Sequence, residues 1–172
     1  MATISNPPAE SHGSSYGFLL DTYETEVLKT AGMWIAFPDD SLDFRPAMKS
    51  RSVQEQMEHQ VRSEAHWMST MFGVETGDPN PADKSVRGYI EQYRSDAAKR
   101  LQVLRSKSGD WWRETAKFFD VPRSRAWIFV RRLNHSAHHR GQLIVYLRVL
   151  GLRVPSVYGH TADTGGSVIY QF

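Results

Sequence analysis

The chain has 172 residues, of which 40% are hydrophobic and 23% are charged, as in an ordinary globular domain. Its 21 basic and 19 acidic residues leave a net charge of +2, which argues against the cationic face of a nucleic-acid-binding protein. No cysteine is present, which excludes disulfides, thiolate zinc sites and a protein thiol nucleophile, and no apolar run reaches the ~18 residues of a membrane span.

The N-terminal segment is predicted to be an arm followed by the first helix of the domain. Residues 1–15 are polar and turn-rich and lack a signal-peptide pattern, so we expect a flexible arm on a cytoplasmic protein. Residues 16–172 are then expected to form a single domain. Apolar residues recur near helical spacing over residues 16–37, and "FPDDSLDFRP" that follows is typical of a loop.

The second and third helices are predicted from capping signals and apolar stripes. Ser52 or Ser50 can cap the second helix, Glu55 completes a capping box with Ser52, and Gly73 ends the helix. A loop, "GVETGDPNPADK", separates this helix from a third. Because proline is favoured in the first turn of a helix, Pro81 predicts a start near Ala82, with an apolar stripe that continues to Leu104.

The C-terminal part is predicted to contain a short helix, "WWRETAKFF", and a long one. The long helix runs from about Ser124 to Leu150, where Gly151 and Pro155 form a normal stop. The tail beyond it is irregular, and Val168 to Phe172 can pair as a short strand. Helices joined by moderate loops predict an all-α fold, an antiparallel helical bundle with an extra short helix.

Three of the seven histidines fall in "LNHSAHHRGQ", on the predicted fifth helix. His135 and His139 are four residues apart, which puts them within ~40° around the axis and one turn apart, a spacing with which two histidines bind one ion. His138 can instead pair with His135 at three-residue spacing, so the local sequence leaves both pairings open. Gly141 in the middle of this helix indicates a close approach by another helix or by a ligand.

A third ligand has to come from elsewhere, because two histidines make a weak site. His59 and His66 on the second helix share a face but lie ~10 Å apart along the axis, so only one of them can join the site. We favour His59, which is expected to face the bundle interior. The remaining histidines are His12 and His160. The alternative to a metal site is a hydrogen-bonded polar patch and a buried core histidine.

These motifs resemble a known family. The stretch "NHSAHHRGQLIVYLRVLGLRVPSVYG" resembles the C-terminal signature of the DinB/YfiT-like superfamily, in which an H-x-x-x-H pair precedes "RGQ" and a G-x-x-x-P segment. "SVQEQMEHQ" resembles the second-helix histidine context of that family, and "SLDFRP" the stretch before it. The matching positions are His59, His135, His139, Arg140, Gly141, Gln142, Gly151 and Pro155.

The resemblance covers roughly residues 16 to 160 and implies a four-helix bundle in an up-down-down-up arrangement. It further implies a divalent metal ion bound by His59, His135 and His139, and in many members a homodimer. Three neutral imidazoles leave open positions on the ion, as in a catalytic centre, and suit zinc, nickel, iron or cobalt. Zinc and nickel are expected first.

Such an ion lowers the pKa of a bound water or binds a small thiol as its thiolate. Characterised relatives include bacillithiol S-transferases and mycothiol-dependent isomerases. The leading hypothesis is therefore an enzyme that transfers a low-molecular-weight thiol to a small electrophilic substrate. The alternatives are a hydrolase that uses metal-bound water and a non-catalytic metal-binding or stress protein.

Several further residues are candidates for supporting roles. Asp163 or Glu58 is a candidate general base, and Gln142 a candidate fourth ligand that would close the site. Arg132 and Arg140 are candidates for holding an anionic substrate, although surface salt bridges are the commoner use of such residues. Four aromatic residues exceed what one short helix needs, and part of this surface is predicted to form a homodimer contact: Trp111, Trp112, Phe118 and Phe119.

Overall fold

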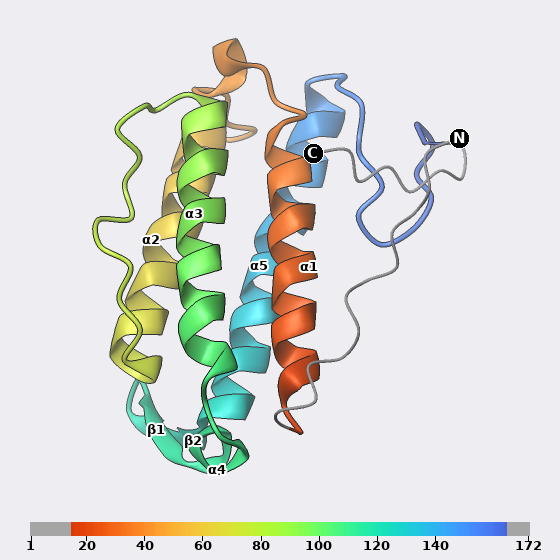
Figure 1. Cartoon of the computed structure of the whole chain (residues 1–172). Helices are drawn as coiled ribbons and strands as arrows, with labels where there is room; N and C mark the ends of the chain where they lie inside the picture. The colour runs from red at the N-terminus through yellow and green to blue at the C-terminus, as the bar shows by residue number, and fades with distance from the viewer. Residues whose placement is uncertain (1–14, 165–172) are drawn as a thin grey trace.

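A computed structural model describes residues 15–164 and consists mainly of four long helices packed side by side (Figure 1). These are α1 (Gly17–Trp34), α2 (Val53–Phe72), α3 (Val86–Arg105) and α5 (Arg125–Val149). α1 packs against α3 and α5, and α2 packs against the same two helices. α1 and α5 run in one direction and α2 and α3 in the other, which confirms the predicted up-down-down-up bundle.

The ends of α2 follow from the predicted capping residues. The Ser52 hydroxyl accepts a hydrogen bond from the Glu55 amide, and the Glu55 carboxylate accepts one from the Ser52 amide, so the capping box is present. At the other end Gly73 takes a left-handed conformation with φ of 65°, which glycine adopts without a steric penalty. Both predictions are confirmed, and they set the position of His59 along the helix.

The predicted start of the third helix at Ala82 is wrong, because α3 begins only at Val86. Ser85 is the N-cap, and its hydroxyl accepts a hydrogen bond from the Gly88 amide. The side chain of Asp83 accepts a hydrogen bond from the Ser85 amide. The residues just before Ser85 therefore form a turn and are not part of the helix. Gly88 is required here, since a Cβ would lie 2.0 Å from the Asp83 carbonyl oxygen.

The predicted short helix over "WWRETAKFF" is also corrected. Only α4 (Gly109–Arg113) is helical, and the chain then forms an antiparallel hairpin of β1 (Thr115–Phe118) and β2 (Val121–Ser124). Nine residues are too few for helical periodicity to exclude a strand, and the β-branched and aromatic residues here favour a strand. Pro122, which cannot donate to a ladder, fits because this hairpin has only edge strands.

α4 and the hairpin lie at the end of the bundle where α2 and α3 end and α5 begins (Figure 1). α5 begins at Arg125, close to the predicted start at Ser124, and Ser124 is its N-cap. A short 3₁₀ helix, η1 (Asp39–Ser41), lies in the loop between α1 and α2. The core between the helices contains large apolar side chains that are at most 2% exposed: Tyr23, Met33, Trp34, Met57, Met68, Tyr89, Tyr93, Trp112 and Phe129.

The chain beyond α5 has no helix or strand over residues 150–164, as expected for the irregular tail. The expected strand at Val168–Phe172 lies outside the described residues, as does nearly all of the expected arm, so the division into an arm and a single domain stays a prediction. Within residues 15–164 none of the helices is both long enough and apolar enough to cross a membrane.

Candidate metal centre

The packing of α2 on α5 brings three histidine rings together near the middle of both helices. The ring of His59 lies 5.3 Å from that of His135 and 4.6 Å from that of His139, measured between centroids. One ligand nitrogen from each ring lies within 4.8 Å of the others. His139 is buried, and the other two rings are partly exposed. The group could therefore hold a metal ion on the side facing solvent.

The closest pair of nitrogens has the spacing of two ligands of one ion. The Nε2 atoms of His135 and His139 are 3.2 Å apart. Two nitrogens bound at ~2.05 Å to one tetrahedral ion are separated by about 3.3 Å. Without an ion, the same distance fits a hydrogen bond in which one ring donates to the other.

The Nδ1 atom of His139, on the side of the ring away from His135, is hydrogen-bonded to two glutamines. It lies 2.9 Å from Oε1 of Gln56 on α2 and 3.0 Å from Oε1 of Gln142 on α5. Because both partners are acceptors, Nδ1 carries the proton and Nε2 is left with a lone pair. Gln142 thus orients a candidate ligand through a hydrogen bond, in the way that outer partners of metal-bound histidines do.

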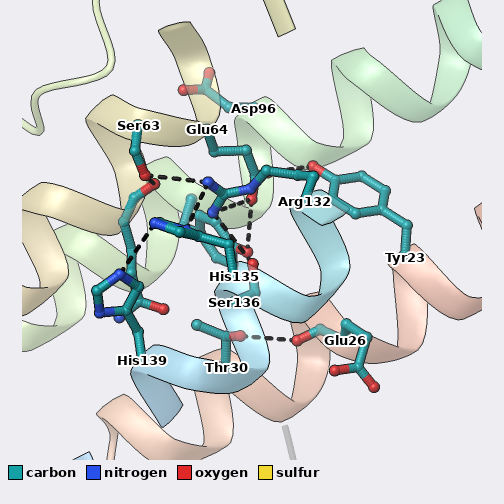
Figure 2. A network of polar contacts seen from close by, with 12 residues as sticks. Tyr23, Glu26, Thr30, Ser63, Glu64, Asp96, Arg132, His135, Ser136 and His139 are labelled. Atoms are coloured by element: carbon teal, nitrogen blue, oxygen red, sulfur yellow. Dashed lines mark hydrogen bonds and ion pairs between the residues drawn. The ribbon is translucent and has the colours of Figure 1, made fainter. Parts of the chain in front are cut away.

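The outer nitrogen of His135 faces Arg132, one turn earlier on α5. The Arg132 guanidinium donates to His135 Nδ1 at 3.0 Å, to the Ser63 hydroxyl and to the Ser136 hydroxyl (Figure 2). A guanidinium only donates, so Nδ1 of His135 accepts and its Nε2 carries the proton in the neutral ring. That Nε2–H points at the lone pair of His139, which accounts for the 3.2 Å contact.

Behind Arg132 lies a buried carboxylate, Glu64 of α2, which is 0% exposed. It forms ion pairs with Arg132 and with Arg100 of α3, and it accepts hydrogen bonds from the hydroxyls of Tyr23 and Tyr93. Burial raises the pKa of Glu64, but the two guanidiniums and the two hydroxyls outweigh burial, so its pKa lies below the usual value. Glu64 therefore balances the charge of Arg132 inside the bundle.

The three rings are neutral at pH 7, as metal ligands must be. Burial and the Arg132 guanidinium lower the pKa of His135 to about 3. Burial and the neighbouring His59 lower the pKa of His139 to about 4. Burial and the positive charges of Arg51 and Arg132 also lower the pKa of His59. Protonation thus competes weakly for the nitrogen lone pairs.

A pocket of about 610 Å³ opens beside the rings and extends toward the hairpin. His59 and His135 line it, together with Trp67 of α2 and Phe118 and Phe119 of the hairpin. This volume is within the range of small-molecule sites. The candidate metal site is thus open on one side to a space that a substrate can enter.

The other histidines are placed differently. His66 is exposed on α2, and His160 is exposed in the tail. His138 is exposed and lines the pocket, with its ring centroid 5.1 Å from that of His139. His12 lies outside the described residues. Of the two pairings that the sequence left open, the structure brings His135 together with His139, and it selects His59 over His66.

Both arginines predicted to lie on the surface are buried. Arg132 and Arg140 are each 1% exposed, so neither a surface salt bridge nor an anionic substrate accounts for them. Arg140 pairs with the buried Glu26 of α1 and contacts Tyr158 of the tail, and so ties the tail to the bundle. The stretch around "HRGQ" therefore serves packing as well as the site.

The two candidate bases have other partners and do not line the pocket. Glu58 pairs with Lys84, and Asp163 accepts from Arg148 and from the Val154 amide. No neighbouring helix approaches Gly141 closely, since nothing in the described part of the chain lies within 4 Å of a Cβ built there, and the alternative of a ligand stays a prediction.

The aromatic surface of the predicted short helix is largely used inside the molecule. Trp112 is 1% exposed and packs on Phe129, and Phe118 packs on Trp67.

The sequence contains a pattern that would have indicated the buried polar residues of α2, which we did not predict. Gln56, Gln60 and Glu64 are spaced by four, the same polar stripe that singles out the histidines on α5, and all three are buried.

Comparisons with known proteins agree with this fold. A family model described as the DinB family matches residues 19–165. A crystal structure of a DinB-like protein from Bacillus cereus is similar, with a TM-score of 0.71 and 28% identity over 84% of this chain and 97% of that one. A DinB-like protein from Bacillus subtilis shares the fold at a TM-score of 0.66, with 17% identity over 81% and 96% of the two chains. No curated protein matches.

Proposed function

This chain belongs to the DinB family, and from that premise we propose that it binds one divalent metal ion through His59, His135 and His139 and acts as an enzyme on a small molecule. The reaction we propose is the transfer of a low-molecular-weight thiol to an electrophile, with zinc or nickel at the site. The observation that carries the proposal is the 3.2 Å separation of two Nε2 atoms beside an open pocket.

The donor set suits such an ion. Three neutral imidazoles leave coordination positions free, and the pocket lies on the same side as the rings. When bound, the ion supplies a Lewis acid that stabilises a thiolate or a hydroxide at neutral pH. Ligation through Nε2 of His135 needs the ring proton on Nδ1, so Arg132 has to release that atom. Arg132 keeps its partners Glu64, Ser63 and Ser136.

Thiol transfer is favoured over hydrolysis by the composition of the pocket wall. None of the nine residues that line the pocket is a carboxylate. Activation of a water for hydrolysis commonly uses a carboxylate base beside the metal, as in the zinc proteases. A thiol bound as a thiolate needs no such base. An open pocket favours an enzyme over a non-catalytic metal-binding protein, in which a fourth protein ligand is expected to close the site.

Two further parts of the proposal concern the surroundings of the protein. We propose a cytoplasmic location, on the grounds that the chain has no cysteine and therefore no disulfide. We also propose a homodimer, which the family resemblance implies.

The experiment is a thiol-transfer assay with metal-loaded protein. Purified chain is stripped with chelator and reloaded with zinc or nickel, and then incubated with a chromogenic electrophile and each of several thiols, including bacillithiol, glutathione and cysteine. We expect metal-dependent conjugation of at least one thiol, lost in His139→Ala. Full metal occupancy with no conjugation, but with turnover of ester substrates, would replace this proposal by the hydrolase.

A further inference from the structure

We propose that the pocket beside the three histidines binds a small organic anion that carries a flat apolar group. Trp67, Phe118 and Phe119 form its apolar wall, and the guanidinium of Arg131 supplies a positive charge among its lining residues. The substrate class rests on the proposed function, because the pocket adjoins the candidate metal site. The binding of such an anion is independent of metal and can be tested without it.

The apolar wall is built from three rings that hold one another in place. The Phe118 ring packs on Trp67 at 5.3 Å and on Phe119 at 4.8 Å, in both cases edge to face. Phe118 also packs edge to face against Trp127, with the ring centroids 5.2 Å apart. Rings locked in this way lose little side-chain entropy on binding, and their accessible surface suits a flat apolar group.

Phe119 has a backbone conformation that its side chain does not favour. Among residues 15–164 it is the sole non-glycine residue with a positive φ, of 50°, a region where a bulky side chain is uncommon and strained. Burial does not compensate, since 60% of the side chain is exposed. An exposed aromatic ring held in a strained turn at the edge of a pocket indicates a role in binding.

The charge of the pocket indicates that the ligand carries an anionic group. Its nine lining residues include the guanidinium of Arg131 and no carboxylate. Arg131 forms no ion pair with any residue in the described part of the chain, and its guanidinium lies 5.9 Å from the Trp127 ring. A cation without a carboxylate partner, next to an apolar wall, is complementary to a carboxylate, sulfonate or phosphate on an apolar ligand.

Together these features orient the ligand. We place its apolar group against the hairpin and Trp67, its anionic group toward Arg131, and its remaining atoms toward His59 and His135, which also line the pocket. For an electrophilic substrate, this places the reacting carbon next to the proposed metal.

The test uses two fluorescent probes that differ in charge. 8-Anilinonaphthalene-1-sulfonate is a flat apolar anion, and N-phenyl-1-naphthylamine is its neutral counterpart. Each is titrated into metal-free protein and into zinc-loaded protein, and stoichiometry and Kd are taken from fluorescence. We expect one anion per chain in both forms and weaker binding of the neutral probe.

Variants separate the two parts of the pocket. Arg131→Gln should weaken the anion about fivefold, the effect of one charge-assisted contact, and leave the neutral probe unchanged. Phe119→Gly should weaken both probes while the melting temperature stays equal or rises, because glycine accepts the positive φ. The matched controls are Arg94→Gln, an exposed arginine on α3, and Phe18→Ala, which removes an aromatic side chain that is also 60% exposed.

The proposal is overturned if Arg131→Gln affects the two probes alike, if Phe119→Gly binds as the wild type does, or if the controls reproduce these losses. The outcomes are separable from those of the proposed function. Anion binding without thiol transfer would support the proposed anion pocket and contradict the proposed transferase. Thiol transfer to an anionic electrophile, unchanged in Arg131→Gln, would contradict the anion pocket and support the transferase.

Discussion

The Nε2 atoms of His135 and His139 lie 3.2 Å apart because each ring is oriented from behind by a different partner, Arg132 for the first and a pair of glutamines for the second. The two rings thus meet at a point that the third ring, His59 of α2, also faces. The site depends on the α2–α5 contact as much as on the four-residue spacing within α5.

Replacement of any of the three histidines should remove the metal. We expect His59→Ala, His135→Ala and His139→Ala each to lose most of their affinity, because two imidazoles hold a divalent ion poorly. His66→Ala and His138→Ala should keep about one ion per chain, with at most a ~10-fold loss if His138 supports the site indirectly. Metal content is measured after dialysis against chelator and reloading. A His138→Ala protein that loses its metal while His139→Ala keeps it would contradict the assignment.

The glutamines behind His139 should tune affinity without acting as ligands. Gln142→Leu removes an acceptor of the His139 Nδ1–H and should weaken zinc binding ~10-fold, within the range of outer-partner substitutions. The control is Gln102→Leu on an exposed position of α3. Zinc affinity is determined by competition with a chelator of known affinity. A Gln142→Leu protein with no zinc at all would instead indicate that Gln142 ligates the ion directly.

The buried carboxylate behind Arg132 should matter strongly for folding. Glu64→Gln leaves Arg132 and Arg100 without their common counter-charge and should lower the free energy of unfolding by about 3–5 kcal/mol. Glu91→Gln, which breaks an exposed pair with Arg87, should cost less than ~1 kcal/mol. Urea unfolding of the metal-free proteins measures both, and similar losses in the two variants would show that the buried pair has no special role.

The metal-free protein should become less stable as the pH falls from about 6.5 to about 4. Unfolded histidine has a pKa near 6.5, whereas burial lowers the pKa of His135 to about 3 and that of His139 to about 4. In this interval the unfolded chain binds protons that the folded chain does not, so protonation favours unfolding, and the stability is fully present only above pH 6.5. Urea unfolding at several pH values measures the slope, which should be smaller in His135→Ala. An equal slope in that variant would assign the effect to other groups.

The homodimer should form through the apolar side chains that are exposed at the two ends of α5. Four apolar side chains there are each more than 40% exposed, and helical spacing puts them within about 100° of arc: Trp127, Val130, Val145 and Val149. Sedimentation at micromolar concentration should give a dimer for the wild type and a monomer for Val145→Glu, with Arg94→Gln as a control. A monomeric wild type would remove this prediction.

Periodicity and caps were enough to predict the long helices. The apolar stripes, the Ser52–Glu55 capping box and the stop at Gly73 are local features, and local features decide where a helix begins and ends. The predicted helix boundaries were wrong where the local sequence favours a turn or a hairpin over a helix. Ser85 and Asp83 form a cap and a turn, so α3 begins later than predicted. The nine residues of "WWRETAKFF" were too few to distinguish a hairpin from a helix.

The histidines show the same division between local and tertiary information. Four-residue spacing put His135 and His139 on one face of a helix, and it could do so because both belong to one helix. Whether His59 or His66 joins them depends on the register of α2 against α5, which no local pattern encodes. Burial of Arg132 with Glu64, and the pocket wall contributed by the hairpin, also depend on contacts between residues distant in sequence. The sequence alone therefore determined the long helices and which histidines can share one helix face, and only the packing of those helices decided which rings meet and what surrounds them.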